Sequence, residues 1–148
     1  MPSLGTPKGE RDAIRLALVA SEFNYDVTAL MLERAREEAE FLHAEVTGEV
    51  KVPGVFEMPL AAKAFFDKPD VDAVIVLGAV IEGETSHDEL VANQSARKLL
   101  DLSVSSGKPL GFGISGPGES RLQAQDRIEK AADAVRAAVK MVERLRGL

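Results

Sequence analysis

The clearest indication of the fold is the run DAVIVLGAVI, from Asp72 to Ile81. After its first residue, this run contains only apolar residues and one glycine. A strand that is apolar at consecutive positions, and not just at alternate ones, is buried on both faces, as in a parallel sheet covered by helices. The rest of the chain is therefore expected to supply further parallel strands and the helices that cover them.

The chain before this run predicts two strands and two helices. Residues 13–20, AIRLALVA, form a short apolar segment between polar residues, and residues 48–52, GEVKV, form a second one that a Pro-Gly pair ends. One helix is predicted from Val27 onward, where apolar residues recur with helical spacing. The other is predicted over residues 58–66, MPLAAKAFF, because proline is tolerated in the first helical turn.

The chain after the run predicts a helix, a strand and a further helix. Ser86 fits the N-cap of the first helix, with Glu89 as its capping-box partner, and that helix extends to Gly107. Residues 109–115, PLGFGIS, form the fourth strand, GPGES turns the chain, and residues 121–145 are helical, straight or kinked. Strand and helix thus alternate four times. This order predicts a single-domain, three-layer α/β/α sandwich with a four-stranded parallel sheet and right-handed crossovers.

Composition limits the classes of partner. The 148 residues are 45% hydrophobic, which suits one domain over residues 12–148 after a flexible N-terminal arm over residues 1–11. A formal net charge of −6 makes nucleic acid an unexpected partner. With no cysteine and two histidines, neither a disulfide framework nor a thiolate or histidine metal site is expected. We find no signal peptide or membrane-length apolar run, so a soluble, cytoplasmic protein without a membrane partner is expected.

The predicted sheet also predicts where a ligand binds. In open parallel sheets, ligands bind outside the carboxyl ends of the strands. Four segments lie there in the predicted fold, namely residues 21–26, 53–59, 78–87 and 112–118. They contain two glycine-rich turns and the candidate residues Phe23, Phe56, Glu57, His87 and Phe112.

The glycine-rich turns and the histidine have two interpretations each. Residues 83–85, Gly-Glu-Thr, and residues 116–118, Gly-Pro-Gly, each precede a helix, where free backbone N–H groups and the helix dipole favour an anion. Either segment could equally be an ordinary strand-to-helix turn. His87 follows the first turn, where an imidazole could accept and donate a proton, or could simply be solvated.

Three other side chains also allow two interpretations. Phe23 and Phe112 could stack on a flat heteroaromatic ligand, or could cover the core or contact another subunit. Glu57 stands between two apolar residues and needs a hydrogen-bond donor, which could be the start of the following helix or the hydroxyls of a ligand.

Arg127, in LQAQDRIEK, is a candidate for bidentate phosphate binding. Its alternative is an exposed arginine that pairs with Asp126 or Glu129.

Five segments in order resemble the lumazine synthase family: SEFN, VPGVFEMPLAAK, DAVIVLGAVIEGETSHDELVA, GFGISGP and LQAQDRI. The similarity extends from Leu16 to Leu145, and the patterns PGxFExPLAAK and GxVIxGETxH are highly specific together. The resemblance implies a flavodoxin-like fold and a transferase of riboflavin biosynthesis. That enzyme condenses 5-amino-6-(D-ribitylamino)uracil with 3,4-dihydroxy-2-butanone 4-phosphate, releases phosphate and water, and needs no metal or organic cofactor.

The resemblance also implies roles for single residues. His87 matches the proton-transfer histidine of the family, Phe23 the residue that stacks on the pyrimidine, and Glu57 the acceptor of ribityl hydroxyl groups. Phe112 and Arg127 match residues that reach the site of a neighbouring subunit. The implied pyrimidine and ribityl pocket consists of Phe23, Val55, Phe56, Glu57, Ala79, Val80, Ile81 and Phe112. The implied phosphate and butanone site consists of Glu84, Thr85 and Arg127.

Several positions resemble the archaeal members more than the bacterial ones. Glu82 stands where bacterial members often have arginine, and Asp88-Glu89-Leu90 replaces an aromatic-Asp-aromatic pattern. SGPG replaces a threonine-rich turn with one extra residue, so the match at Arg127 requires that insertion. These differences leave the partners of His87 unassigned.

The family also implies partners and two alternatives. Its members form homopentamers, and some assemble into 60-subunit capsids with sites at subunit interfaces. One alternative is an archaeal-type riboflavin synthase, which shares the fold but lacks the intact GETxH and FExPLA patterns. The other is a non-catalytic lumazine- or flavin-binding shell protein, against which the retained histidine, turn and arginine argue.

Overall fold

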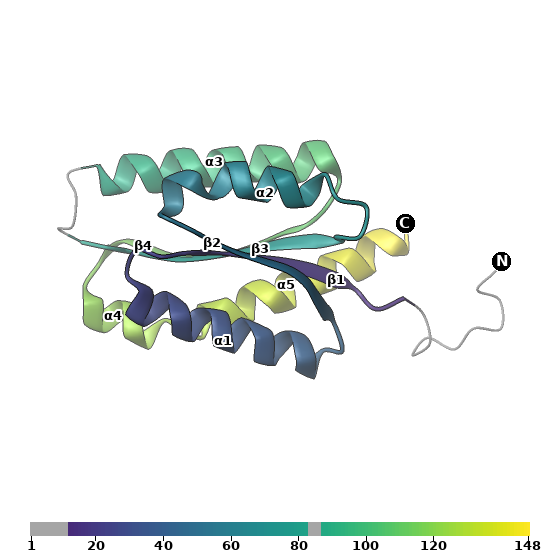
Figure 1. The fold of residues 1–148 in the computed structure, drawn as a ribbon, viewed down its shortest axis with the longest axis horizontal. Helices are drawn as coiled ribbons and strands as arrows, with labels where there is room; N and C mark the ends of the chain where they lie inside the picture. Colours follow the sequence, from purple (N-terminus) through teal and green to yellow (C-terminus); the bar gives the residue numbers. More distant parts are fainter. Residues whose placement is uncertain (1–11, 83–86) are drawn as a thin grey trace.

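The structure, a computed structural model, describes residues 12–82 and 87–148 and consists of a parallel sheet between two layers of helices (Figure 1). The arm expected over residues 1–11 and the cap expected at Ser86 lie outside the described residues. Each strand pairs in parallel with its neighbours, in the order β2-β1-β3-β4. The strands are β1 (Arg15–Ser21), β2 (Glu45–Val52), β3 (Ala73–Ile81) and β4 (Leu110–Glu119). The predicted fold class is confirmed.

The helices cover both faces of this sheet. In Figure 1 α2 and α3 lie above the sheet, and α1, α4 and α5 lie below it. The upper layer is formed by α2 (Met58–Phe66) with the preceding 3-10 helix η2 (Val55–Glu57) and by α3 (Asp88–Ser106). The lower layer is formed by α1 (Tyr25–Phe41), α4 (Arg121–Asp126) and α5 (Lys130–Arg146).

The two central strands divide the core into two halves. Alternate residues of a strand point to opposite faces, so β1 and β3 each contribute to both halves. Leu18 and Ile75 pack with the buried stripes of α1 and α5, while Val19 and Val76 pack with α2 and α3. Every residue from Ala73 to Ala79 is buried, as the apolar run predicts.

β4 differs from its prediction. It continues to Glu119, four residues past the expected end, because Ile81 pairs with Glu119 and the Glu82 amide donates to the Glu119 carbonyl at 2.7 Å. The interpretation of the whole GPGES segment as a turn is therefore wrong. The expectation that Phe112 lies beyond a strand end is also wrong: it pairs with Val76 inside β4, and its 40% exposure follows from the position of β4 at the sheet edge.

The helix predictions are largely confirmed. α2 has the predicted bounds, and α3 ends at Gly107, whose φ of 73° is the left-handed conformation that glycine adopts readily. The C-terminal helical segment is broken at residues 127–129, between α4 and α5. Leu30, Leu90 and Leu100 lie within the predicted helices, yet each of these apolar side chains is about half exposed.

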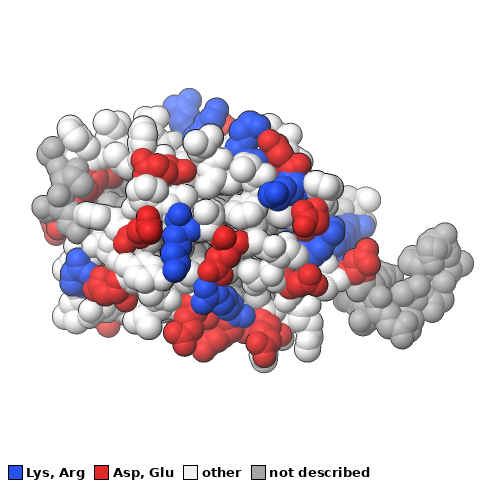
Figure 2. Space-filling model, viewed as in Figure 1, with Lys and Arg blue, Asp and Glu red and all other residues white. Residues whose placement is uncertain are grey.

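Charged side chains are interspersed over the face shown in Figure 2. Basic and acidic groups alternate there, and the described residues on this face form no continuous basic surface of the kind that binds nucleic acid. In the part of the chain that the structure describes, no helix combines the length and the apolar character needed to cross a membrane.

Candidate active site

A cavity of about 320 Å³ lies at the carboxyl end of the sheet. Its walls come from the loops after β1 and β2, the helix η2, the last residues of β3 and the first turn of α3. The lining is mainly apolar and consists of Ser21, Phe23, Pro53, Gly54, Val55, Phe56, Glu57, Ala79, Val80, Ile81, Asp88 and Val91. A concave, mostly apolar cavity with few polar groups is the usual form of a small-molecule site.

Most residues predicted for the pyrimidine and ribityl pocket line this one cavity. They come from three separate segments of the sequence, and the structure brings together Phe23, Val55, Phe56, Glu57, Ala79, Val80 and Ile81. Phe112 does not line the cavity. Sequence reasoning did not single out Ser21, Pro53, Gly54 or Val91, although each lies within one of the quoted family segments.

The loops after β1 and β2 are held together by backbone hydrogen bonds. The Glu22 amide donates to the Val52 carbonyl at 2.7 Å, and the Phe23 amide donates to the Pro53 carbonyl at 3.1 Å. Phe23 is 52% exposed, so its ring is not part of the packed core. An aromatic ring that is fixed at its backbone and open on its face can stack on a flat ligand.

Glu57 is partly buried, and its carboxylate closes the turn that precedes α2. Its Oε1 accepts from the Gly54 amide at 2.9 Å, while its own amide donates to the Gly54 carbonyl at 3.2 Å. Glu57 occupies the N-cap position of α2, as one sequence interpretation expects, but its side chain makes no capping bond to α2 and accepts from the Gly54 amide. An ionised carboxylate accepts several hydrogen bonds, so this one leaves capacity for the hydroxyls of a ligand.

Asn24 links three segments around the cavity. Its Nδ2 donates to the Ala79 carbonyl at 2.9 Å, and its Oδ1 accepts from Nη2 of Arg121 at 2.9 Å. Asn24 has a φ of 61°, a left-handed conformation that asparagine tolerates better than most residues. Its residue type and its position directly before α1 were the available signals for this role in the sequence.

The proposed proton-transfer residue lies at the start of α3. His87 is exposed at the N-cap position, and its carbonyl accepts from the Val91 amide at 2.9 Å. The next residue, Asp88, lines the cavity. Glu84 and Thr85, which the resemblance assigns to the phosphate, lie outside the described residues.

A buried ion pair lies beside the ends of β3 and β4. Nη1 of Arg127 donates to Oε1 of Glu119 at 3.0 Å, and the Ser115 hydroxyl donates to Oε2 at 2.6 Å. The Glu119 side chain is 0% exposed, whereas the Arg127 side chain is 49% exposed. Pairing of Arg127 with Asp126 or Glu129, the alternative from the sequence, is therefore not what the structure contains. The sequence reasoning missed Glu119, because residue type alone does not reveal burial inside a glycine-rich segment.

A lysine at the end of β2 lies against the first residue of α1. Nζ of Lys51 is 5.0 Å from the centroid of the Tyr25 ring, and a hydrogen bond with Tyr25 raises the pKa of Lys51 above its ordinary value. Lys51 therefore stays cationic at this end of the sheet. Among the residues that the structure describes, no group of three or more His, Cys, Asp or Glu side chains is placed to hold a metal ion.

Sequence comparisons identify relatives of the chain. A sequence model of the family described as 6,7-dimethyl-8-ribityllumazine synthase matches residues 13–146. A 6,7-dimethyl-8-ribityllumazine synthase of Pyrobaculum arsenaticum is 57% identical over 136 residues, which are 91% of each chain. One of Pyrobaculum calidifontis is 59% identical over 132 residues, 88% of each chain. One of Methanocaldococcus jannaschii is 54% identical over 135 residues, 91% of this chain and 96% of that one.

Proposed function

This chain belongs to the 6,7-dimethyl-8-ribityllumazine synthase family, and we propose that the cavity at the carboxyl end of its sheet is the active site. Its function is that of a transferase of riboflavin biosynthesis. The reaction condenses 5-amino-6-(D-ribitylamino)uracil with 3,4-dihydroxy-2-butanone 4-phosphate. The resemblance to the archaeal members is confirmed, and the relatives do not favour the riboflavin synthase or shell-protein alternatives.

One observation carries the assignment of the site. Of the eight residues that match the pyrimidine and ribityl pocket of the family, all except Phe112 line one cavity, although they come from three sequence segments. In this proposal Phe23 stacks on the pyrimidine, and Glu57 accepts hydrogen bonds from ribityl hydroxyls. The backbone of residues 79–81 binds the polar edge of the ring, with the Ala79 carbonyl held in place by Asn24.

The chemistry that follows binding requires proton transfers and an anion site. The ring amine attacks the ketone, water leaves to give an imine, phosphate is eliminated, and the second carbonyl closes the ring with loss of water. We propose that His87 moves protons in these steps, and that Glu84, Thr85 and Arg127 bind the phosphate. Holding two small reactants side by side supplies much of the acceleration, because it removes the entropy cost of a bimolecular encounter.

We also propose that the site is completed by a neighbouring copy of the chain. Phe112 and Arg127 match residues that reach across a subunit boundary, and neither lines the cavity of its own chain. The outer faces of α2 and α3 expose Leu60, Leu90, Leu100 and Val104, which is unusual for a surface that stays in contact with water. A homopentamer, alone or packed into a 60-subunit capsid, in the cytoplasm, is the assembly that the family implies.

The test mixes the purified protein with the two substrates and follows lumazine fluorescence together with phosphate release. A sample without enzyme measures the spontaneous condensation. We expect both signals to rise well above that control and in equal amounts. If neither signal rises, the same protein is offered lumazine alone. Formation of riboflavin would then support the riboflavin synthase alternative, and binding of lumazine without turnover would support the shell-protein alternative.

A further inference from the structure

We propose that Glu119 is a positioning residue, whose buried carboxylate holds the Arg127 guanidinium in the orientation that binds the substrate phosphate. This inference rests on the proposed function, which assigns Arg127 to the phosphate. It assigns a role to a residue that neither the sequence motifs nor the lining of the cavity singles out. Glu119 does not touch the substrate in this proposal and acts through Arg127.

The burial of Glu119 is the first argument. Removing a carboxylate from water costs several kcal/mol, and an apolar residue of the same size is often at least as stable as a buried ion pair. The Glu119 side chain is nevertheless 0% exposed and bonded to Ser115 and Arg127. A buried charge that adds little net stability indicates a role other than stability. Here the charge binds a half-exposed arginine.

The rigidity of the acid is the second argument. The Glu119 carbonyl accepts from the Glu82 amide, which ties the residue to the end of β3. Gly116 packs over its carboxylate: a Cβ at that position would lie 3.3 Å from Oε2 and only 2.2 Å from the Val80 carbonyl oxygen. Together with the Ser115 hydroxyl, these contacts fix the carboxylate on the strand side and leave Oε1 for Arg127.

The third argument is that the Arg127 side chain is long and half exposed. Its backbone lies in the break between α4 and α5, where its amide donates to the Ala124 carbonyl and its carbonyl accepts from the Lys130 amide. An arginine side chain loses up to about 2 kcal/mol of conformational entropy when it is fixed. The hydrogen bond from Nη1 of Arg127 to the fixed Glu119 carboxylate orders the arginine side chain before the ligand binds. Other N–H groups of the guanidinium remain on its exposed side for a phosphate.

Two substitutions at position 119 distinguish the effect of the hydrogen bond to Arg127 from the effect of the packing of the buried side chain. Glu119→Met keeps the length of the side chain and removes the acceptor, so we expect KM for the butanone phosphate to rise about tenfold, while KM for the aminouracil stays within about twofold. Glu119→Gln keeps an oxygen for Arg127 and a donor for Ser115, so it should rescue KM to within about threefold of wild type. The inhibition constant of inorganic phosphate should follow the same order.

Glu38→Met is the matched control. Glu38 is also buried, and it binds Arg34 and Arg136 where α1 meets α5, whereas the partner of Glu119 is Arg127. This variant loses a buried acid and its ion pairs too, so its melting temperature should fall. We expect its KM values for both substrates to equal those of wild type, which separates loss of stability from loss of position.

Several outcomes would overturn the inference. A folded Glu119→Met protein with an unchanged KM for the butanone phosphate would do so, as would equal increases in both KM values. If Glu119→Met does not fold, the Ser115→Ala variant is used. A rise of about threefold in its KM for the butanone phosphate supports the inference, and an unchanged KM overturns it. Absence of turnover by wild type would instead contradict the proposed function. Calorimetric titration with inorganic phosphate then decides: binding that Glu119→Met weakens supports the inference, and equal binding, or none by wild type, overturns it.

Discussion

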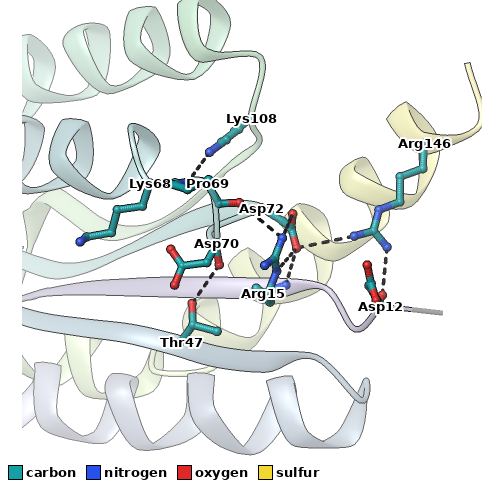
Figure 3. A network of polar contacts seen from close by, with 9 residues as sticks. All are labelled: Asp12, Arg15, Thr47, Lys68, Pro69, Asp70, Asp72, Lys108 and Arg146. Atoms are coloured by element: carbon teal, nitrogen blue, oxygen red, sulfur yellow. Dashed lines mark hydrogen bonds and ion pairs between the residues drawn. The ribbon is translucent and has the colours of Figure 1, made fainter. Parts of the chain in front are cut away.

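The two ends of the sheet differ: one end carries a network of polar contacts, and the other end carries the cavity. At the amino end, where Figure 1 places the C-terminus, charged side chains and backbone groups bind one another (Figure 3). At the carboxyl end, the loops surround a cavity of about 320 Å³. The difference indicates that stability and binding are assigned to different ends, so substitutions at the two ends should have separable effects.

Asp72 is the centre of the amino-end network. Its Oδ2 accepts from the Arg15 amide at 2.7 Å and from Arg15 Nε at 3.3 Å, and Nη2 of Arg146 lies 3.6 Å away. Nearby, Nζ of Lys108 donates to the Lys68 carbonyl at 2.7 Å, beyond the end of α2 (Figure 3). These bonds join the loop between α2 and β3 to the start of β1, to the last helix and to the loop before β4.

The largest difference in activity is expected between variants of the two histidines. His87→Ala should lower kcat by about tenfold to a hundredfold and still exceed the rate without enzyme, because proximity remains when a proton-transfer group is lost. His43→Asn is the control, since His43 is exposed after α1 and has a φ of 59°, which asparagine tolerates. Steady-state rates would contradict this expectation if His87→Ala equalled the blank, or if both variants lost activity alike.

Two phenylalanines give the next largest effect. Phe23→Ala should raise KM for the aminouracil about tenfold, because it removes a stacking surface worth about 1–3 kcal/mol. Its melting temperature should barely change, since the ring is half exposed. Phe41→Ala removes a 76% exposed ring at the opposite end of α1 and should change neither quantity. Equal KM values for the two variants would remove Phe23 from the site.

The amino-acid sequence predicts the fold better than it predicts the site. The apolar run before Ile81 and the bounds of α2 depend on local composition and periodicity, and both are confirmed. The extension of β4 to Glu119 was missed because it depends on pairing with β3, a contact between distant parts of the chain. The link from Asn24 to the Ala79 carbonyl was missed for the same reason.

The predicted parallel sheet places Phe23, Phe56 and Glu57 at its carboxyl edge, but only the resemblance assigned them to one pocket with Val55 and residues 79–81. Periodicity places Phe23 and Phe56 near strand ends, but it does not show that they face a shared space. The family motifs suggested this, and the structure shows these residues in one lining. Charge partners were less predictable, because Arg127 has nearer acids in sequence than Glu119, and burial decides among them.

A smaller effect, on stability alone, is expected at the amino end. Asp72→Ala should lower the melting temperature by roughly 3–6 °C, because loss of charge-assisted hydrogen bonds costs about 1.5 kcal/mol in a domain of this size. The ratio kcat/KM should stay within about twofold of wild type. Asp70→Ala, an exposed acid in the same loop, is the control and should melt as wild type does. A loss of activity in Asp72→Ala without a loss of stability would contradict the assignment of stability to the amino end and of binding to the carboxyl end.

The smallest effect is expected for an ion pair that belongs to neither end. A hydrogen bond from Arg34 lowers the pKa of Glu129 below its ordinary value of 4.5. A carboxylate whose pKa is lower in the folded state adds stability that is complete above the unfolded-state pKa and is lost as the pH falls through the folded-state pKa.

Glu129→Gln should therefore melt slightly below wild type at pH 6, and the two curves should converge as the pH is lowered below 4. The difference at pH 6 should also shrink in about 1 M salt, because the exposed Glu129 and the partly exposed Arg34 are both screened by salt. Calorimetric melting at a series of pH values measures both dependences, with turnover at pH 7 unchanged. A gap that persisted at low pH would show that Glu129 stabilises the junction of α1 and α5 by packing, without a contribution from its charge.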